Sequence, residues 1–233
     1  MLTVDASRKD IVDYYSQFDE VSAYLIRVDA KEHNTSVPII KATSKLIQEL
    51  QFHKPVILAD ADIVVFGYLS HGLSALSTSF ADSKREHDLA AKYVDKKDGG
   101  NYKEKFFVPK IFQFVKVDGE LAALVGLLGP NGLCSCSVCS AAKVTGEALK
   151  KEDINKLISR WSKDDRSNHF LCCLVEWRDK MAKISTPSAK LEEYKKILVE
   201  AENIYDSQKE NLVFEQMIKQ KDYPAWEAAF FSK

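Results

Sequence analysis

The sequence lacks any segment that would cross a bilayer. Its longest apolar run, residues 121–128, is far shorter than the roughly 20 apolar residues that a membrane-spanning helix needs. The first residues, Met-Leu-Thr-Val-Asp, also lack the basic and then apolar pattern of an export signal. We therefore expect a cytoplasmic protein without a membrane partner.

An excess of charge of either sign is also missing. The 233 residues include 33 Lys and Arg against 34 Asp and Glu, which gives a formal net charge of -1. A protein that coats nucleic acid by bulk attraction needs a positive excess, so any contact with nucleic acid must be local. Apolar residues make up 45% of the chain, which is enough for a globular core.

Cysteine is absent from most of the chain. All five cysteines fall between positions 134 and 173, and three of them are Cys134, Cys136 and Cys139. An odd number of cysteines in so short a stretch, without an export signal, is not a disulfide framework. The pattern indicates a metal site held by thiolates.

Three thiolates leave a tetrahedral zinc ion one ligand short. We expect His169 to be the fourth ligand, because its predicted helix carries apolar neighbours that would pack it back toward the cysteine turn. Cys172 and Cys173 on the same helix are the alternatives, since their sulfur atoms are equally soft ligands. Four protein ligands leave no open position for water, so we expect the zinc to be structural.

The first part of the chain alternates short apolar runs with helical patterns. Each apolar run predicts a strand that is buried on both faces, and strands of this kind joined by helices form parallel sheets with right-handed crossovers. Ser36 is a predicted helix cap with Pro38 in the first turn, and Gly72 is a predicted helix end. The expected order is strand 22–28, helix 36–50, strand 55–59, helix 63–70 and strand 73–77.

The rest of the chain is mainly helical by pattern. We expect a fourth strand at 106–115, with Pro109 at an edge or bulge, and a short helix at 120–128. Beyond the cysteines the apolar periodicity predicts helices at 145–162, 166–183, 188–205 and 208–220, and an apolar stripe runs from Leu191 to Tyr205. The pattern therefore predicts an α/β domain at 1–132 and a zinc-binding, helical region at 133–233.

The Cys-x-Cys-x-x-Cys motif at 134–139, followed by His169 at the opening of an apolar helix, resembles the zinc site of the tRNA-guanine transglycosylase family. This family includes queuine and archaeosine tRNA-ribosyltransferases and DNA-modifying relatives. The preceding strand, helix and strand match its layout, so the resemblance covers roughly residues 20–185. It implies the C-terminal half of a (β/α) TIM-type barrel with structural zinc, and a role in exchanging or modifying 7-deazaguanine bases, such as queuosine precursors, in tRNA or DNA.

The chain also departs from that family. Ser77 stands where the family has an acidic nucleophile, and a serine alcohol without a neighbouring base is a poor substitute. The family's Gly-Gly stretch is missing near residues 26–29, and only four of the eight barrel strands are expected. The resemblance therefore implies a chain that is non-catalytic alone and that acts, if at all, as a base-exchanging pentosyltransferase with a partner subunit.

A half barrel leaves two unpaired strand edges, and such edges invite pairing with another chain. The chain is then a split subunit completed by a second protein, a fragment of a longer protein, or a homologue that closes its sheet as a homodimer. The alternative function is a zinc-stabilised protein-interaction module that has lost transglycosylase chemistry and binds protein through the stripe from Leu191 to Tyr205.

Three residues are candidates for catalysis. Asp60 and Asp62 follow the strand at 55–59, at the carboxyl edge where barrel enzymes keep their catalytic groups. Their carboxylates suit work on a base or binding of Mg²⁺, while the plainer interpretation is that one of them caps the next helix. Ser77 is the third candidate, because it occupies the position that matches the family's nucleophile.

Overall fold

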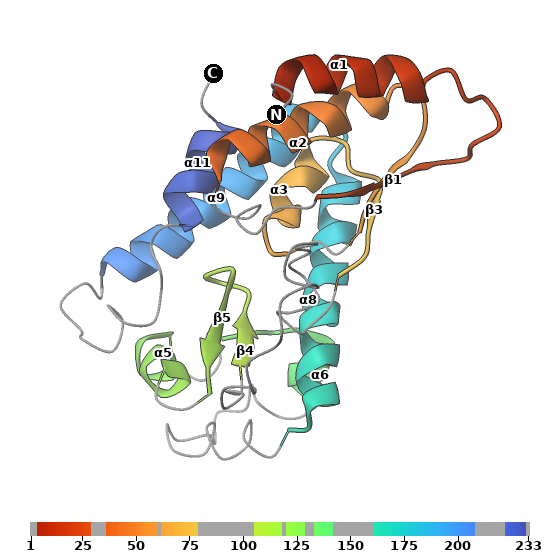
Figure 1. Cartoon of the computed structure of the whole chain (residues 1–233). Coiled ribbons are helices and arrows are strands. Elements are labelled where there is room, and N and C mark those ends of the chain that lie inside the picture. Colours follow the sequence, from red (N-terminus) through yellow and green to blue (C-terminus); the bar gives the residue numbers. More distant parts are fainter. Residues whose placement is uncertain are drawn as a thin grey trace, which may run out of the picture. The chain divides into compact units, whose positions relative to one another are not determined.

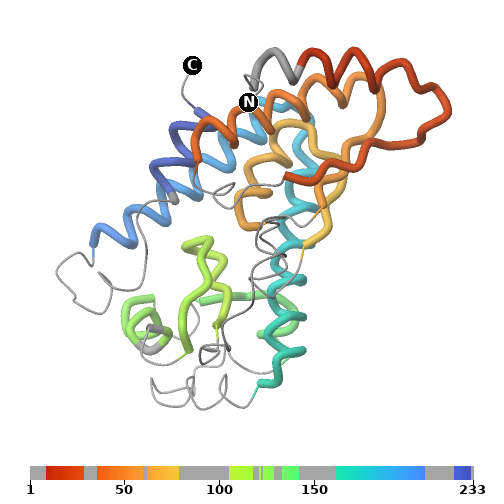
Figure 2. The backbone as a smooth tube through the Cα atoms, viewed as in Figure 1, coloured from red at the N-terminus to blue at the C-terminus, as the bar shows by residue number. Residues whose placement is uncertain are grey.

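The structure is a computed structural model that describes residues 4–28, 36–59, 62–78, 105–117, 120–128, 133–141, 161–207 and 222–231. The chain forms two compact units, the first from residues 1–95, 181–195 and 221–233 and the second from 96–180 and 196–220. Figure 1 shows the elements, and Figure 2 follows the chain through them. The expected boundary after residue 132 divides the chain differently, and it stays a prediction about where the α/β pattern gives way to the helical pattern.

The described part of the first unit contains a parallel three-stranded sheet. Its strands are β1 (Tyr24–Arg27), β2 (Val56–Ala59) and β3 (Ala75–Leu76), and their order in the sheet is β1-β2-β3. The helices α2 (Val37–Leu50) and α3 (Val65–Ser70) join them. The predicted β-α-β-α-β order with parallel pairing is therefore confirmed.

Local sequence explains the helix that follows β1. Ser36 has the extended backbone of an N-cap residue, although its side chain makes no capping hydrogen bond, and Pro38 lies in the first turn. Ile40, Ile47 and Leu50 are buried on one face of α2. Gly72 follows α3 with a φ of 98°, a backbone conformation that favours glycine and so explains why the helix ends there.

Two further helices lie in the described part of the first unit, and neither was expected from the sequence. The first, α1 (Val4–Tyr15), packs along α2, as Figure 2 shows. The second, α11 (Asp222–Phe230), also packs on α2 and places the ring of Phe230 5.5 Å from the ring of Tyr68. This aromatic contact ties the last described helix to α3.

The second unit contains a hairpin where a single strand was expected. The strands β4 (Lys105–Val108) and β5 (Gln113–Lys116) pair antiparallel, so the prediction of one strand over 106–115 is wrong. Pro109 begins the turn, where its missing N–H is harmless. Phe112 completes the turn with a φ of 46°. Among the described residues, β4 and β5 form their own sheet and add no strand to the parallel one.

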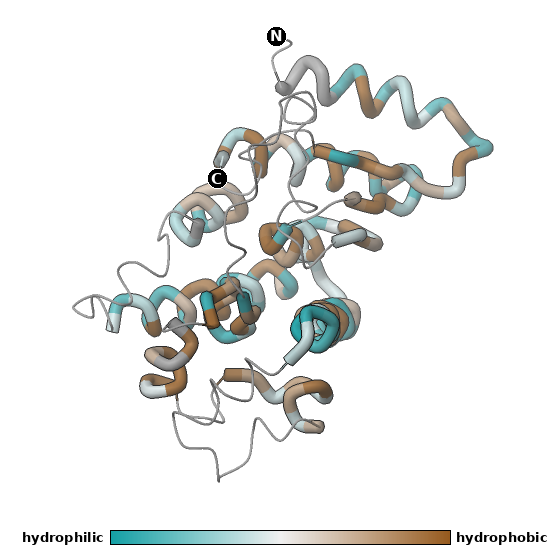
Figure 3. Tube along the Cα trace, turned by 60° about the horizontal axis from the view of Figure 1, so that its bottom comes forward, coloured by the Kyte–Doolittle hydropathy of each residue, from teal (hydrophilic) through white to brown (hydrophobic). Residues whose placement is uncertain are grey.

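The helices around the cysteines follow the predicted pattern where they are described. They are α5 (Glu120–Leu128), α6 (Ser137–Ala141), α8 (Lys163–Lys183) and α9 (Pro187–Asp206). Hydrophobic and hydrophilic residues alternate along the helices of both units, as Figure 3 shows. The helices expected at 145–162 and 208–220 lie outside the described residues.

Most of the stripe on α9 is not available as a surface. Tyr194, Leu198, Ala201 and Tyr205 are all buried within the chain. The expectation that this stripe is a partner surface is therefore wrong for these four positions, because their side chains already pack inside the protein.

The described residues form a mixed α/β structure with small sheets, and they include no closed barrel. None of the helices in the described part of the chain combines the length and the apolar character that a membrane span requires.

Candidate metal centre

Cys134 and Cys136 lie on a tight turn that leads into α6, and Cys139 lies within that helix. Cys134, Cys136 and Cys139 are all buried, although hydrophilic residues lie between them. The backbone N–H of Cys136 donates to Sγ of Cys134 at 3.3 Å, and the N–H of Cys139 donates to Sγ of Cys136 at 3.5 Å. These bonds point the sulfur atoms inward and supply partial positive charge beside them.

Two more donors come from α8. His169 and Cys173 are four residues apart, so they lie one above the other on the same helix face. His169 is fully buried and Cys173 is nearly so. The face that they share is turned toward the cysteine turn.

The distances between these donors match those in a tetrahedral site. Nδ1 of His169 lies 3.2 Å from Sγ of Cys139, 3.3 Å from Sγ of Cys136 and 3.8 Å from Sγ of Cys173, and the sulfurs of Cys134 and Cys173 are 3.6 Å apart. With zinc bonds of about 2.3 Å to sulfur and about 2.0 Å to nitrogen, two ligands of a tetrahedron lie about 3.5 to 3.8 Å apart. The two distances that involve Cys173 fall within this range, and those from Nδ1 to Cys136 and Cys139 are slightly shorter.

Four of these residues form a buried group that could hold a metal ion. The ligand atoms of Cys134, Cys136, His169 and Cys173 all lie within 4.8 Å of one another. The predicted ligands Cys134, Cys136, Cys139 and His169 are also brought together, since Cys139 contacts the same imidazole nitrogen. Sequence reasoning placed Cys173 only as an alternative to His169, whereas the structure brings both to the site.

The strand β4 fixes the orientation of the His169 ring. Nε2 of His169 lies 2.7 Å from the carbonyl oxygen of Phe107, and because a carbonyl oxygen only accepts, Nε2 carries the proton. The ring of Phe106 stacks on the imidazole at 4.3 Å with an interplanar angle of 8°. Nδ1 is thereby left as the atom that faces the sulfurs, as in metal sites whose histidine is held by a backbone acceptor.

The pKa of His169 reflects the thiolates beside it. Burial by itself lowers this pKa, but hydrogen bonds with Cys134 and Cys136 outweigh burial and raise the pKa to about 9. Without a metal the imidazole therefore carries a proton on each nitrogen. The proton on Nε2 faces the Phe107 carbonyl, and the proton on Nδ1 faces the sulfurs. A metal ion would take the place of the proton on Nδ1.

The pKa values of the four buried thiols move in opposite directions. The hydrogen bond with Cys136 raises the pKa of Cys134, but those with Cys139 and Cys173 outweigh it and lower the pKa to about 6. Hydrogen bonds from Cys134 and Cys139 hold the pKa of Cys136 well below its usual range. Hydrogen bonds with Cys134 and Cys136 hold the pKa values of Cys139 and Cys173 well above theirs. Four sulfur atoms this close become anionic together only if a cation neutralises them.

The other alternative ligand, Cys172, lies apart from this group. Its Sγ atom contacts Oγ of Ser137 at 3.3 Å and Oε1 of Glu176 at 3.6 Å, and the residue is half-buried. Although Cys172 and Cys173 are adjacent, only Cys173 shares the buried face with His169.

Two of the three candidate catalytic residues, Asp62 and Ser77, lie in the described part of the chain, beyond the carboxyl ends of β2 and β3. Asp60 is outside the described residues. Oδ1 of Asp62 accepts a hydrogen bond from the N–H of Ile63 at 2.7 Å in the turn before α3, and the helix itself has no side-chain cap. Ser77 follows β3, is exposed, and donates its backbone N–H to the carbonyl of Leu58 at 2.8 Å. Their catalytic roles stay predictions.

Sequence reasoning missed the contribution of β4 to the metal centre. Two adjacent phenylalanines in a predicted strand indicate burial, but nothing in them indicates contact with a histidine some sixty residues away. The acceptor at Phe107 is a main-chain atom, which leaves no signal in the amino-acid sequence.

Comparison with known proteins yields no family: no family model, no curated protein and no solved structure matches the chain.

Proposed function

We propose that the chain is a zinc-binding protein related to the tRNA-guanine transglycosylases, non-catalytic alone and completed by a partner chain. The observation that carries this proposal is the buried group of thiols around His169, built on the Cys-x-Cys-x-x-Cys spacing. The substrate class that follows from the resemblance is a 7-deazaguanine base, exchanged into or modified within tRNA or DNA.

The donor set favours zinc over other ions. Thiolates and imidazole suit zinc in tetrahedral structural sites, whereas magnesium and calcium require oxygen ligands. Copper(I) also binds soft sulfur, but a site that mixes cysteines with one oriented histidine is typical of structural zinc. The burial of His169 and Cys136 leaves little access for water. Zinc at this site would therefore stabilise the fold and would not activate a substrate.

The parallel sheet supports the idea of a partner chain. In the described part of the sheet, β1 and β3 are the edge strands, and Leu25 on β1 is 70% exposed. Parallel strands are normally covered on both faces and paired on both sides. A complementary half of a (β/α) barrel would supply the missing strands and bring its own acidic groups to the edge where Ser77 lies.

A base-exchange assay tests this proposal. The chain is incubated with labelled guanine and either tRNA or DNA, alone and after co-expression with a candidate complementary half barrel. We expect no exchange by the chain alone and exchange by the completed pair. Turnover by the chain alone would contradict the non-catalytic assignment.

The active pair also tests Ser77. Replacement Ser77→Ala should lower exchange if the side chain takes part in catalysis, while Ser188→Ala, an exposed position on α9, serves as the matched control. Equal activity of the two variants would show that the side chain of Ser77 takes no part in the reaction.

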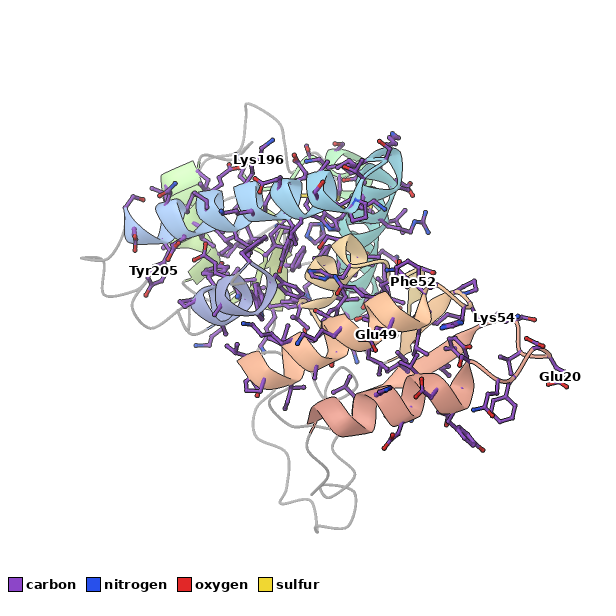
Figure 4. The ribbon with its side chains drawn as sticks, turned by 90° about the horizontal axis from the view of Figure 1, so that it is seen from above. Glu20, Glu49, Phe52, Lys54, Lys196 and Tyr205 are labelled. Carbon is purple, nitrogen blue, oxygen red and sulfur yellow. The ribbon has the colours of Figure 1, made fainter. Side chains whose placement is uncertain are left out.

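A second candidate function is a zinc-stabilised protein-interaction module. Exposed apolar side chains favour it: Phe52 is 84% exposed just beyond α2, where Figure 4 shows it near Glu49 and Lys54. The discriminating result is a partner that co-purifies with the chain, is lost with Phe52→Ser, and confers no base exchange.

A further inference from the structure

The metal centre holds one donor more than a tetrahedral ion uses. The ligand atoms of Cys134, Cys136, His169 and Cys173 lie within 4.8 Å of one another, and Sγ of a fifth residue, Cys139, lies 3.2 Å from Nδ1 of His169. Structural zinc takes four ligands. One sulfur atom must therefore stay outside the coordination sphere while remaining within contact distance of it.

The geometry identifies which donors are fixed. His169 is held by the Phe107 carbonyl on one side and by the Phe106 ring on its face. The sulfurs of Cys134 and Cys136 accept backbone N–H groups within the turn. Each of these three donors thus has a partner that keeps it pointed at the centre.

Cys139 and Cys173 are the two donors left for one position. Both sulfurs contact the same atom, Nδ1 of His169, at 3.2 Å and 3.8 Å. They approach from different elements, Cys139 from α6 and Cys173 from α8. Cys173 is 3.6 Å from Cys134, which is the separation of two sulfurs on one zinc ion.

We propose that Cys139 and Cys173 are alternative fourth ligands that exchange on a single zinc ion, so that the site keeps three sulfurs and one nitrogen in either state. In the exchange, the bond between zinc and one sulfur breaks as the bond to the other forms. The proton of the incoming thiol passes to the outgoing thiolate, so the charge and the coordination number are unchanged. This inference rests on the proposed zinc site and goes beyond the ligand set that the family resemblance implies.

The exchange gives the centre a property that a four-donor site lacks. A four-donor site that loses one ligand must take up water or release the ion. Here the neighbouring sulfur fills the position, so we expect the site to tolerate loss of either thiol but not of both.

Variants of the full chain test the exchange. Zinc per chain is measured by elemental analysis, the sulfur and nitrogen ligands by X-ray absorption at the zinc edge, and affinity by competition with a chromophoric chelator. The variants are Cys139→Ser, Cys173→Ser and the double variant, and Cys172→Ser is the matched control because its sulfur faces Ser137 and Glu176.

Each single variant should retain one zinc with three sulfurs and one nitrogen, and its affinity should fall by only about twofold because one of two equivalent states is lost. The double variant should show two sulfurs and an affinity lower by more than the roughly 100-fold that marks the upper end for outer-shell changes. If one single variant alone drops to two sulfurs, the ligand set is fixed and the exchange is wrong while the zinc site stands. A wild-type chain that binds no zinc would overturn both proposals.

Limited alkylation of the zinc-loaded wild-type chain is a second test of the exchange. Its result does not depend on whether the variants fold. Peptide mass spectrometry should find label shared between Cys139 and Cys173, never on both in one molecule, with Cys134 and Cys136 protected. Cys172 is the positive control. Label confined to one of the two exchanging cysteines would contradict the proposal.

Discussion

The two units of the chain differ in what stabilises the interior of each one. In the first, cohesion is spread over apolar surface: the side chains of Ile40, Ile47 and Val56 are completely buried. The second also has an apolar core, which includes Phe106 and Phe170, but it contains in addition a buried group of thiols around the imidazole of His169. Burial distributes stability over many small contributions, whereas a metal centre concentrates it in one event. The two units should therefore lose stability under different treatments.

Removal of the proposed zinc ion should have the largest effect and should act on the second unit. Structural zinc supplies about 10 to 16 kcal/mol of binding free energy in zinc-finger peptides, and that energy is folding energy. After chelation we expect hydrogen exchange to accelerate in β4 and in the first half of α8, while β1 and β2 keep their protection. A metal-free protein that retains its full melting temperature would contradict a structural role for the metal.

Replacement of His169 should be nearly as damaging. His169→Ala removes a proposed ligand and leaves the Phe107 carbonyl without its hydrogen-bond donor. The zinc content of the purified chain should therefore fall well below one per chain. Cys172→Ala is the control on the same helix and should leave the zinc content unchanged, because Cys172 contacts Ser137. If instead Cys172→Ala releases the zinc, the ligand assignment is wrong.

Truncation in the core of the first unit should cost less and should spare the metal. Ile47 on α2 is completely buried, so Ile47→Ala should lower the free energy of unfolding by about 2 to 5 kcal/mol. Leu25→Ala is the exposed control and should change it by less than about 0.5 kcal/mol. Urea unfolding gives both values, and elemental analysis should find normal zinc in both variants. Loss of zinc from Ile47→Ala would show that the units do not respond separately.

A buried histidine should make the first unit sensitive to acid. Burial lowers the pKa of His71 from its ordinary 6.5 to about 4, and Nε2 of its ring is buried without a hydrogen-bond partner. The folded state therefore favours the neutral ring, so this contribution is complete above pH 6.5, falls as the pH drops toward 4, and is lost below it. The change is at most about 3 kcal/mol.

Two variants isolate that contribution. His71→Gln should flatten the decline in first-unit stability between pH 6.5 and 4, measured by hydrogen exchange in β2. His53→Gln, at an exposed position, should leave the decline as it is. An unchanged slope in His71→Gln would show that another group causes the acid sensitivity.

The parts of the fold that the sequence predicts well are those set by neighbouring residues. The strands around β2 and the end of α3 depend on short apolar runs, on Pro38 and on Gly72, and all of these signals are local. The hairpin was missed because residues 106–115 form one nearly continuous apolar run, in which only Pro109 marks the turn. The helix α1 was not anticipated, because it carries a weak apolar pattern beside many charged residues.

The metal centre was predictable in its residue types but not in its details. The cysteine spacing and the search for a soft fourth ligand led directly to the segment of α8 that supplies one. Choosing between Cys172 and Cys173 required more, because positions three and four residues after His169 flank the same helix face at similar angles. The packing of α8 against the turn decides between them, and that packing is a property of the folded chain.

The hydrogen bond from His169 to the Phe107 carbonyl has a consequence for how this centre tolerates change. Every amino acid supplies the same acceptor at position 107, so no ordinary substitution deletes it. What the bond depends on is the length of the hairpin, since one residue inserted between Val108 and Gln113 would shift β4 or β5 against its neighbour. The candidate metal centre is thus more sensitive to insertions and deletions in the turn between β4 and β5 than to point substitutions in that same turn.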